Sequence, residues 1–579
     1  PFIEHAYSEP EAGYAVRQDQ RLIIYGSTQA AQMDRDSIAE IMGMDVDSIR
    51  VMPSACGGGF GSKLDLSFQP FVALAAWRLD RPVAICYARG ESMRSSTKRH
   101  PSDIRLEVGC DAAGRISGFV FDGMFNTGAY ASWGPTVANR VPVHASGPYV
   151  TPDYRALSVA VHTNAPPAGA FRGFGVPQSA VAQECAYDLL AEKLGMDRLA
   201  FRQMNALQNN MPTVTGQCFE TGVGIADCLA ALQPAWDAAV ARVEQFNNEA
   251  EKTGSVFRKG VGVASCWYGC GNTSLPNPST MRMGLRADGV CLLHQGAMDI
   301  GQGANTVIAQ IAADALGVPV HSLSLLDGDT DLTPDCGKTS ASRQTFVSGK
   351  AALLAGRALR EIILRHANVS DDASIIIEKQ RLQLVDAATG NMANVDLSSL
   401  PVNDYGYVFM SEETYDPPTT PLDENGQGSP YAVYGYGAQM IELTVDRGLG
   451  QVRLDKMTTA HDVGRAINPL LVEGQIEGGV AQGIGLALME DYLPGRTENL
   501  HDYLIPTIGD IPEFEHIIVE VADAEGPYGA KGLGEHVLIP TAPAIVNAIR
   551  QAVGVLITNL PATADKIRAA LQAQETGHD

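Results

Sequence analysis

Apolar and polar residues alternate in several stretches of the chain, and this pattern predicts antiparallel hairpins. Residues 14–25 place polar side chains at a turn between two apolar runs. Residues 103–122 repeat the pattern around a turn at 111–115, which contains Asp and Gly, both common hairpin residues. The same signal predicts further hairpins around 286–289 and 446–450.

A second pattern, apolar residues three and four positions apart, predicts helices that alternate with the strands. The expected helices cover 34–44, 67–79, 179–194, 225–247, 307–316, 347–368, 476–489, 543–552 and 562–573. Further strands are expected at 48–52, from 260, at 438–445 and at 451–458, whereas 389–430 should be mostly loop. Strands and helices mixed in this way favour an α/β (α+β) fold.

The chain is long enough for two to four domains, since it has 579 residues. Residues 247–259 are polar and lack a clear period, so we interpret 248–259 as a linker. This interpretation divides the chain into a first domain, 1–247, and a second domain, 260–579.

Charge and hydropathy exclude two kinds of partner. The chain carries 42 Lys and Arg against 66 Asp and Glu, a net charge of −24. Such a surface repels nucleic acid and anionic membranes. No stretch approaches the roughly 18 consecutive apolar residues of a membrane-spanning helix.

The cysteines favour a reducing compartment. Ten cysteines are scattered along the chain without a C-x-x-C pair, which argues against a disulfide scaffold and against iron–sulfur or zinc ligation. We therefore predict a cytoplasmic location. The sequence begins at Pro1 with no visible signal peptide, and a processed subunit or a fragment remains an open alternative.

Five glycine-rich loops are the candidates for ligand binding. Most of them open a helix, where free main-chain N–H groups and the helix dipole favour an anion. They lie at 56–63, 169–178, 301–306, 338–345 and 529–536. Because these loops fall in both predicted domains, we expect a large, polar, anionic ligand in the cleft between the domains.

Two of the loops carry residues that suit particular chemistry. Glu535 follows a glycine turn and precedes an apolar run, which favours a partly desolvated general base, with a solvated surface Glu as the alternative. Phe171, Arg172 and Phe174 would suit a flat ligand bearing an oxyanion, unless the rings fill a core.

Nucleoside triphosphate hydrolysis is excluded by the loop at 56–63. A P-loop needs Gly before its Lys and Ser or Thr after it, and Ser62 and Leu64 stand there. The hydroxyl groups and Arg343 of 338–345 could bind phosphate or could cap the following helix. Side chains with metal-ligand spacing are absent from the sequence, so any metal would be carried by a cofactor.

Taken together, the segments 56–63, 169–178, 301–303, 340–344, 461–469 and 532–535 resemble the molybdenum-binding part of the xanthine oxidase family. The resemblance spans nearly the whole chain. It implies two large mixed domains with a molybdenum–pterin cofactor in their cleft, in the cytosine dinucleotide form, with oxo and sulfido ligands on the Mo. It also implies a small-molecule substrate and [2Fe–2S] and FAD partner subunits in an oligomeric heteromer.

The family's functional residues carry over by position. Glu535 matches the general base, with Arg140 and Arg172 at the substrate and metal. The residues that match cofactor contacts are Gln29, Gly59, Phe60, Gly61, Phe171, Arg172, Gly301, Gln302, Gly303, Ser340, Ala341, Ser342, Arg343 and Gln344. The residues that match the substrate pocket are Leu64, Arg140, Phe171 and Phe174. Gln29, Gln302 and Glu535 should then share one cavity.

Departures from the family pattern narrow the range of possible substrates. Leu64 stands where animal purine oxidisers carry a Glu, and Gly173 stands where carbon monoxide dehydrogenases place a copper-binding Cys. The family's iron–sulfur and flavin modules have no counterpart here. We predict hydroxylation of an N-heteroaromatic substrate, with purines as one option. The alternatives are an aldehyde oxidoreductase and a molybdopterin-carrying subunit without turnover.

Overall fold

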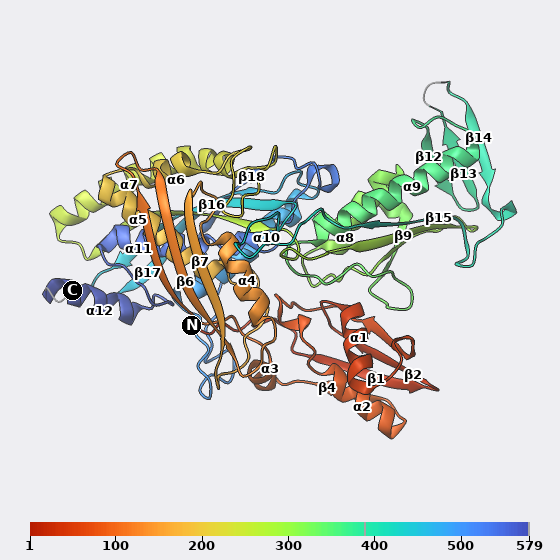
Figure 1. Ribbon diagram of the computed structural model, residues 1–579, viewed down its shortest axis with the longest axis horizontal. Coiled ribbons are helices and arrows are strands. Elements are labelled where there is room, and N and C mark those ends of the chain that lie inside the picture. Colours follow the sequence, from red (N-terminus) through yellow and green to blue (C-terminus); the bar gives the residue numbers. More distant parts are fainter. Residues whose placement is uncertain (387–388, 577–579) are drawn as a thin grey trace.

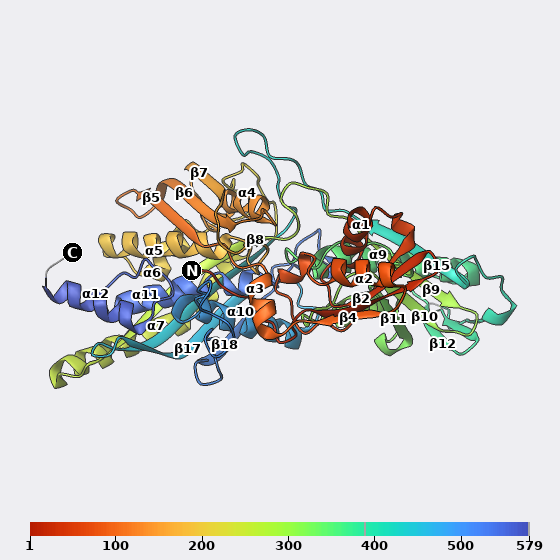
Figure 2. The same cartoon turned by 90° about the horizontal axis from the view of Figure 1, so that it is seen from below.

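The computed structural model describes residues 1–386 and 389–576. Five sheets and the helices that cover them form an elongated molecule (Figure 1), which confirms the α/β (α+β) fold class. The sheets β18-β17-β16-β8 and β11-β10-β9-β15 lie toward opposite ends of the long axis in both views (Figure 2).

The N-terminal sheet has the strand order β3-β2-β1-β4. Its strands are β1 (Ala12–Gln18), β2 (Arg21–Gly26), β3 (Ile49–Pro53) and β4 (Val83–Cys86), and helices α1 (Ala31–Met42) and α2 (Gln69–Leu79) cover it. Strands β1 and β2 pair antiparallel with Tyr14 opposite Tyr25, which confirms the hairpin predicted at 14–25.

A three-stranded sheet, β5-β6-β7, follows. It consists of β5 (Ser102–Cys110), β6 (Ile116–Gly128) and β7 (Asp153–His162), after the short helix α3 (Arg89–Ser95). The helices associated with it are α4 (Gly134–His144), α5 (Val176–Leu194) and α6 (Arg198–Asn205). The second predicted hairpin is therefore confirmed as β5 and β6.

The central sheet is buried on both faces. Its strands are β8 (Phe257–Gly269), β16 (Tyr434–Asp446), β17 (Gln451–Asp462) and β18 (Glu513–Val519). One set of alternate residues of β16, such as Tyr436 and Met440, packs in a cluster with helix α7 (Ile225–Thr253). The other set packs in a cluster with α10 (Pro469–Leu488) and α11 (Thr541–Val553), before the final helix α12 (Ala564–Thr576).

The other large sheet contains β9 (Ser279–Arg286), β10 (Cys291–Gln295), β11 (Leu323–Asp327) and β15 (Tyr407–Tyr415). Helices α8 (Ala304–Leu316) and α9 (Gly349–Ala367) share its core. A small sheet of β12 (Ser374–Glu378), β13 (Arg381–Val385) and β14 (Met392–Asp396) completes this end.

Residues 389–430 are mostly loop, as expected, although β14 and β15 both lie there. The expected linker needs correction. The predicted linker at 248–259 is regular structure, since α7 continues to Thr253 and β8 begins at Phe257. Buried residues at helical spacing from Ile225 to Val243 hold α7 on the central sheet, and this packing extends the helix beyond its amphipathic part.

Among the helices of residues 1–386 and 389–576, none combines the length and the hydropathy that a membrane span requires.

Candidate functional site

A cavity of about 640 Å³ lies where the glycine-rich loops converge. Gln29, Gln302 and Glu535 all line it, although they come from three distant parts of the sequence. Its wall is formed by residues from 6–8, 56–64, 170–174, 300–307, 339–345, 463–478 and 531–535. All five loops that the sequence analysis singled out therefore contribute to one cavity.

The carboxylate of Glu535 is fixed by two donors on one oxygen. Its Oε2 accepts a hydrogen bond from the Gly173 amide at 2.9 Å and another from the Tyr268 hydroxyl. Its own amide donates to Ser342 Oγ at 3.0 Å. The side chain is half-buried at the cavity wall. A carboxylate held in this way can accept a proton from a ligand in the cavity.

Arg172 is an anchor for the loop that carries Glu535. Its Nε donates to the main-chain oxygen of Gly534. The remaining guanidinium nitrogens donate to Gln475 and Gln482 on α10 at 3.2–3.3 Å. Burial lowers the pKa of Arg172 to about 10, so it still carries a positive charge near neutral pH.

Gln29 joins two of the loops through its side-chain amide. Its Oε1 accepts from the Gly61 amide at 2.9 Å, and its Nε2 donates to the Thr339 oxygen at 2.8 Å. A Cβ at Gly59 would lie 2.4 Å from Gln29 Oε1, so this contact requires glycine.

Left-handed backbone is concentrated in the same loops. Phe60, Phe174, Ala341 and Ser342 all have φ between 48° and 56°, a region that non-glycine residues seldom adopt. All except Ala341 line the cavity. Strain of this kind is common at ligand sites, where the surrounding structure imposes it.

The loop at 301–306 is organised by Asp299, which the sequence analysis missed. The Asp299 carboxylate accepts from the amides of Gly301 at 2.8 Å and Asn305 at 3.0 Å, at the start of α8. Gln302 folds back onto its own loop, where Nε2 donates to the Met298 oxygen at 3.0 Å. Gly303, at φ +83°, is the residue that precedes α8. The only sequence feature that could have pointed to Asp299 is its spacing from Gly301 and Gly303.

Arg343 lines the cavity, but both of its terminal guanidinium nitrogens donate to the protein, so its contact with a phosphate stays a prediction. The side chain is buried and donates to the main-chain oxygens of Cys336, Asn277 at 2.9 Å and Pro278 at 2.7 Å. It thus fastens the loop at 338–345 to neighbouring segments. Gln344 also bonds internally, since its Nε2 donates to Thr339 Oγ1 at 2.8 Å.

Arg140 also departs from its expected role as a substrate contact. It is not among the residues that line the cavity, and only 2% of it is exposed. Its Nη2 donates to the Gly271 oxygen at 2.6 Å, and its Cζ lies 4.7 Å from the centre of the Tyr268 ring. Carbonyl groups and aromatic rings therefore hold this cation behind the cavity wall.

The part of the cavity wall around Leu64 is apolar. Leu64 lines it and packs with Ala30 and Ala170. Phe171 and Phe174 line it as well, but the Phe171 ring is already stacked on His5 at 4.2 Å and on Arg99 at 4.0 Å. Phe174 is therefore the better candidate for contact with a flat substrate.

Features of the cavity fit a flat, polar prosthetic group. The Ser340 hydroxyl is buried and has no hydrogen-bond partner among the described residues, so it can donate to a ligand. Gly301 has φ +105° and faces open space. A Cβ at Gly532 would lie 1.9 Å from the main-chain oxygen of Ser342. The backbones of the loops at 529–536 and 338–345 are therefore in direct contact at the cavity. These residues fit a pterin cofactor with phosphate.

A buried ion pair supports the loop at 529–536 from beneath, and the sequence analysis did not find it. Lys531 Nζ donates to Asp462 Oδ2 at 2.5 Å and to the Gly222 oxygen at 2.6 Å. Neither charged side chain is exposed. Lys531 thus connects this loop to the end of β17.

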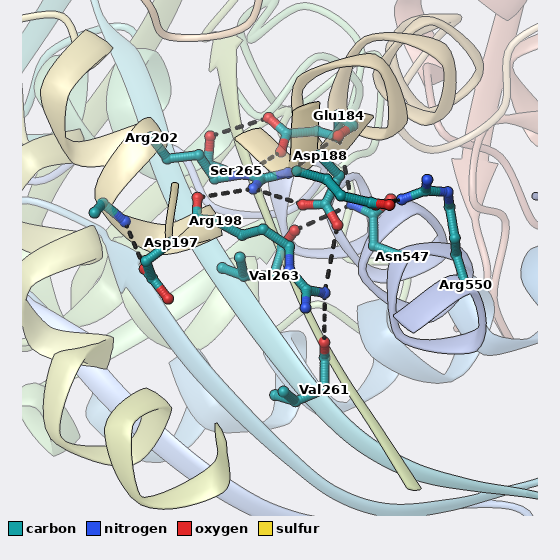
Figure 3. A network of polar contacts seen from close by, with 12 residues as sticks. Glu184, Asp188, Asp197, Arg198, Arg202, Val261, Val263, Ser265, Asn547 and Arg550 are labelled. Atoms are coloured by element: carbon teal, nitrogen blue, oxygen red, sulfur yellow. Dashed lines mark hydrogen bonds and ion pairs between the residues drawn. The ribbon is translucent and has the colours of Figure 1, made fainter. Parts of the chain in front are cut away.

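A second network ties together the helices that follow Gly173 and Glu535 (Figure 3). Arg202 on α6 pairs with Glu184 at 2.7 Å and Asp188 at 2.9 Å, both on α5. Asn547 on α11 donates to the main-chain oxygens of Glu184 at 3.4 Å and Val263, on β8, at 3.3 Å. This network fixes the relative positions of α5 and α11.

A smaller cavity of about 530 Å³ shares part of this wall. Arg465, Ala466 and Ile467 line both cavities. The smaller cavity is also lined by Gln310, Ile311, Asp314 and Tyr528.

Comparison with known families identifies two domains. Family models described as molybdopterin cofactor-binding domains match residues 1–206 and 230–512.

Individual relatives cover almost the whole chain. The xanthine dehydrogenase molybdenum-binding subunit of Escherichia coli O157:H7 is 32% identical over 98% of this chain and 75% of its own length. The aldehyde oxidoreductase of Megalodesulfovibrio gigas is 32% identical over 98% of this chain. This chain spans 60% of the length of that relative.

Solved structures of similar proteins also superpose on nearly the whole chain. The aldehyde oxidoreductase from Desulfovibrio gigas superposes with a TM-score of 0.89 at 30% identity, over 99% of this chain and 60% of its own. Quinoline 2-oxidoreductase from Pseudomonas putida 86 shares the fold, with a TM-score of 0.85 at 24% identity over 99% of this chain and 75% of its own.

Proposed function

Because this chain belongs to the xanthine oxidase family of molybdenum hydroxylases, as its molybdopterin-binding part, we propose that it hydroxylates an electron-poor carbon of an uncharged N-heteroaromatic substrate, with oxygen from water. The observation that carries the proposal is the position of Glu535. Its carboxylate lies on the wall of the same cavity as the apolar residues Leu64 and Phe174.

The reaction needs a two-electron acceptor, and a bound molybdenum–pterin group would supply that redox chemistry. The chain's own residues do the rest. Glu535 accepts the proton that is released as the new C–O bond forms. Arg172 holds the main chain at Gly534 so that the carboxylate faces the cavity. Gln29 and Ser340 provide polar groups for the cofactor.

The position of Arg140 supports an uncharged substrate. Arg140 is withdrawn behind Tyr268 and Phe174, so it does not offer a cation to the ring of a substrate. Leu64 adds apolar surface close by. An uncharged planar ring fits this wall better than an anionic purine does.

An aldehyde is the second candidate. The aldehyde oxidoreductase from Desulfovibrio gigas is 30% identical to this chain with a TM-score of 0.89, and this likeness favours the alternative. An aldehyde also needs a general base and an apolar pocket, which the same residues supply.

The two adjoining cavities support the dinucleotide form of the cofactor. The cavity of about 640 Å³ would hold the pterin, and the neighbouring one of about 530 Å³ would hold the nucleotide. Arg465, on the shared wall, would pair with the phosphates between them. We assign cytosine as the base and oxo and sulfido as the molybdenum ligands on the family resemblance alone.

Electrons leaving the site need further redox groups. Relatives of the chain are named as subunits, among them the molybdenum-binding subunit of a xanthine dehydrogenase. We propose [2Fe–2S] and FAD partner subunits in an oligomeric heteromer, and a cytoplasmic location. Ten free thiols are consistent with that location.

A substrate panel tests the proposal. The isolated protein, assayed with an artificial electron acceptor, should oxidise uncharged N-heteroaromatic compounds such as quinoline or isoquinoline with incorporation of ¹⁸O from labelled water. Turnover of aldehydes only would reject the heteroaromatic assignment.

Replacement of Glu535 tests whether this carboxylate is the general base. Glu535→Gln should lower kcat by about 10²–10⁴ and leave the molybdenum content unchanged. If activity survives the substitution, Glu535 is not the base.

A further inference from the structure

The two oxygens of the Glu535 carboxylate have unequal surroundings. Oε2 accepts both the Gly173 amide, at 2.9 Å, and the Tyr268 hydroxyl. Among the residues that the structure describes, no donor reaches Oε1. One oxygen is therefore committed to the protein, and the other is available to a ligand.

Tyr268 is suited to be a permanent donor. It lies on β8, is fully buried and forms part of a small cluster with Val176 and Ile539. Burial raises the pKa of Tyr268 well above its usual range, so the phenol keeps its proton. A protonated phenol beside a carboxylate donates its hydrogen bond.

Arg140 fixes the Tyr268 ring. Its guanidinium carbon lies 4.7 Å from the centre of that ring and 5.2 Å from the centre of the Tyr431 ring. Hydrogen bonds to the Gly271 oxygen at 2.6 Å and the Gly269 oxygen at 3.5 Å hold the guanidinium in place. A cation over an aromatic ring stabilises the arrangement, and desolvation strengthens it.

We propose that Tyr268, held by Arg140, is a positioning residue that reserves Glu535 Oε1 for the proton transferred in the reaction. The proposal rests on the proposed function, because it assigns the proton to one atom of the general base. The Tyr268 and Gly173 donors stabilise negative charge on Oε2 and prevent the carboxylate from rotating. The proton of the attacking, water-derived oxygen then moves to Oε1 as the new C–O bond forms, and no bond to Tyr268 breaks.

The variants that test the proposal leave the other charged groups near the Glu535 carboxylate unchanged. Arg172 and Arg99 also act on Glu535 electrostatically, and both remain in every variant below. Tyr431 is the matched control, because it is another buried tyrosine against Arg140 and its hydroxyl pairs with Thr273, at 2.5 Å.

The test replaces Tyr268 by Phe in the holoenzyme, with Tyr431→Phe and Glu535→Gln prepared in parallel. Tyr268→Phe should lower kcat about tenfold or more, change KM less than twofold and move the acid limb of the pH profile upward by about one unit. Site-specific 3-fluorotyrosine at 268, a stronger donor, should move that limb downward. Tyr431→Phe should change neither kcat nor the position of the acid limb of the pH profile.

A second readout does not depend on turnover. Infrared titration of cofactor-free protein, with Glu535→Gln subtracted, should show the carboxylate band protonating at higher pH in Tyr268→Phe than in the unsubstituted protein. An unchanged acid limb and an unchanged band in both Tyr268 variants would overturn the proposal. If the Glu535→Gln variant stays active, Glu535 is not the base and the proposed function fails. The Tyr268 variants alone could not reveal that failure.

Discussion

At the residue scale, Gly173 combines two requirements in one position. Its φ of +89° favours glycine, and its amide donates to Glu535 Oε2 at 2.9 Å. An added Cβ would lie 2.5 Å from Pro177 Cγ, in the first turn of α5. A substitution there must shift the amide away from the carboxylate.

We therefore expect Gly173→Ala to lower kcat about 10- to 100-fold while the protein keeps its molybdenum, because small displacements of a catalytic group are costly. Steady-state kinetics and metal analysis of the same sample measure both quantities. The control is Gly195→Ala at the end of α5, where φ is +65° but nothing lies within 4 Å of the added Cβ. Equal losses of kcat in the two variants would contradict a specific role for Gly173.

The sequence predicts Glu535 and Gln29 as site residues, because each lies in a short glycine-rich segment or matches the family by position, and both line the cavity. It could not reveal how Arg140 and Arg343 are used. Their guanidinium groups bind main-chain oxygens of Gly271 and of Asn277 and Pro278, which are distant in the sequence. Tyr268 was missed for the same reason, since its contact with Glu535 joins β8 to a loop 267 residues away.

At the scale of elements, the network around Arg202 determines how α5 and α11 sit on the central sheet (Figure 3). Arg202 and Glu184 are fully buried, and Asp188 is almost so. Arg202→Met would leave two buried carboxylates without this cation. We expect a loss of about 3–5 kcal/mol in the free energy of unfolding.

Denaturant unfolding of the cofactor-free protein measures this loss. The control is Arg550→Met, which removes a partly exposed pair between α11 and Glu192. That change should cost at most about 1 kcal/mol. If the two variants lose equal stability, the buried network does not hold the helices as described.

Elements with strong local signals were predicted well, and elements that depend on tertiary contacts were not. The hairpins at 14–25 and 103–122 were found from alternation and turn residues. The last turns of α7 are polar, so only packing of the preceding part explains why the helix continues to Thr253. Strand β14 has mostly exposed alternate residues and was overlooked for that reason.

At the scale of the whole molecule, two buried carboxyl groups make stability depend on pH. Burial raises the pKa of Glu490 to about 8 and that of Asp34 to about 7. Unfolded Glu and Asp titrate near 4.3 and 3.9, so the folded state binds more protons between these values and pH 8. Stability should therefore be highest in the acid part of this range and fall as pH rises.

Glu490→Gln tests the sign of this effect. The variant keeps an acceptor for the Tyr503 hydroxyl, which lies 2.5 Å from Glu490 Oε2. It should unfold at nearly the same temperature as the parent at pH 5 and at a higher temperature at pH 8.5, since each unit of pKa shift corresponds to about 1.4 kcal/mol. Parallel pH profiles of the melting temperature would show that Glu490 does not contribute.

The sequence predicts that the five loops bind one ligand together, because glycine-rich segments at helix starts commonly bind anions through main-chain N–H groups. The geometry was not predictable, since it depends on how the central sheet, the N-terminal sheet and the sheet of β9 and β15 meet. The colours in Figures 1 and 2 show that these sheets are built from parts of the chain that are far apart in the sequence.

We propose that this cavity holds a molybdenum–pterin group whose metal faces Glu535. Anomalous diffraction from crystals of the protein as isolated, collected on both sides of the molybdenum absorption edge, tests it most directly. We predict one strong molybdenum peak inside the cavity, with Gln29 and the Glu535 carboxylate as its nearest side chains. A molybdenum peak elsewhere, or a cavity occupied by another group in fully active protein, would contradict the claim.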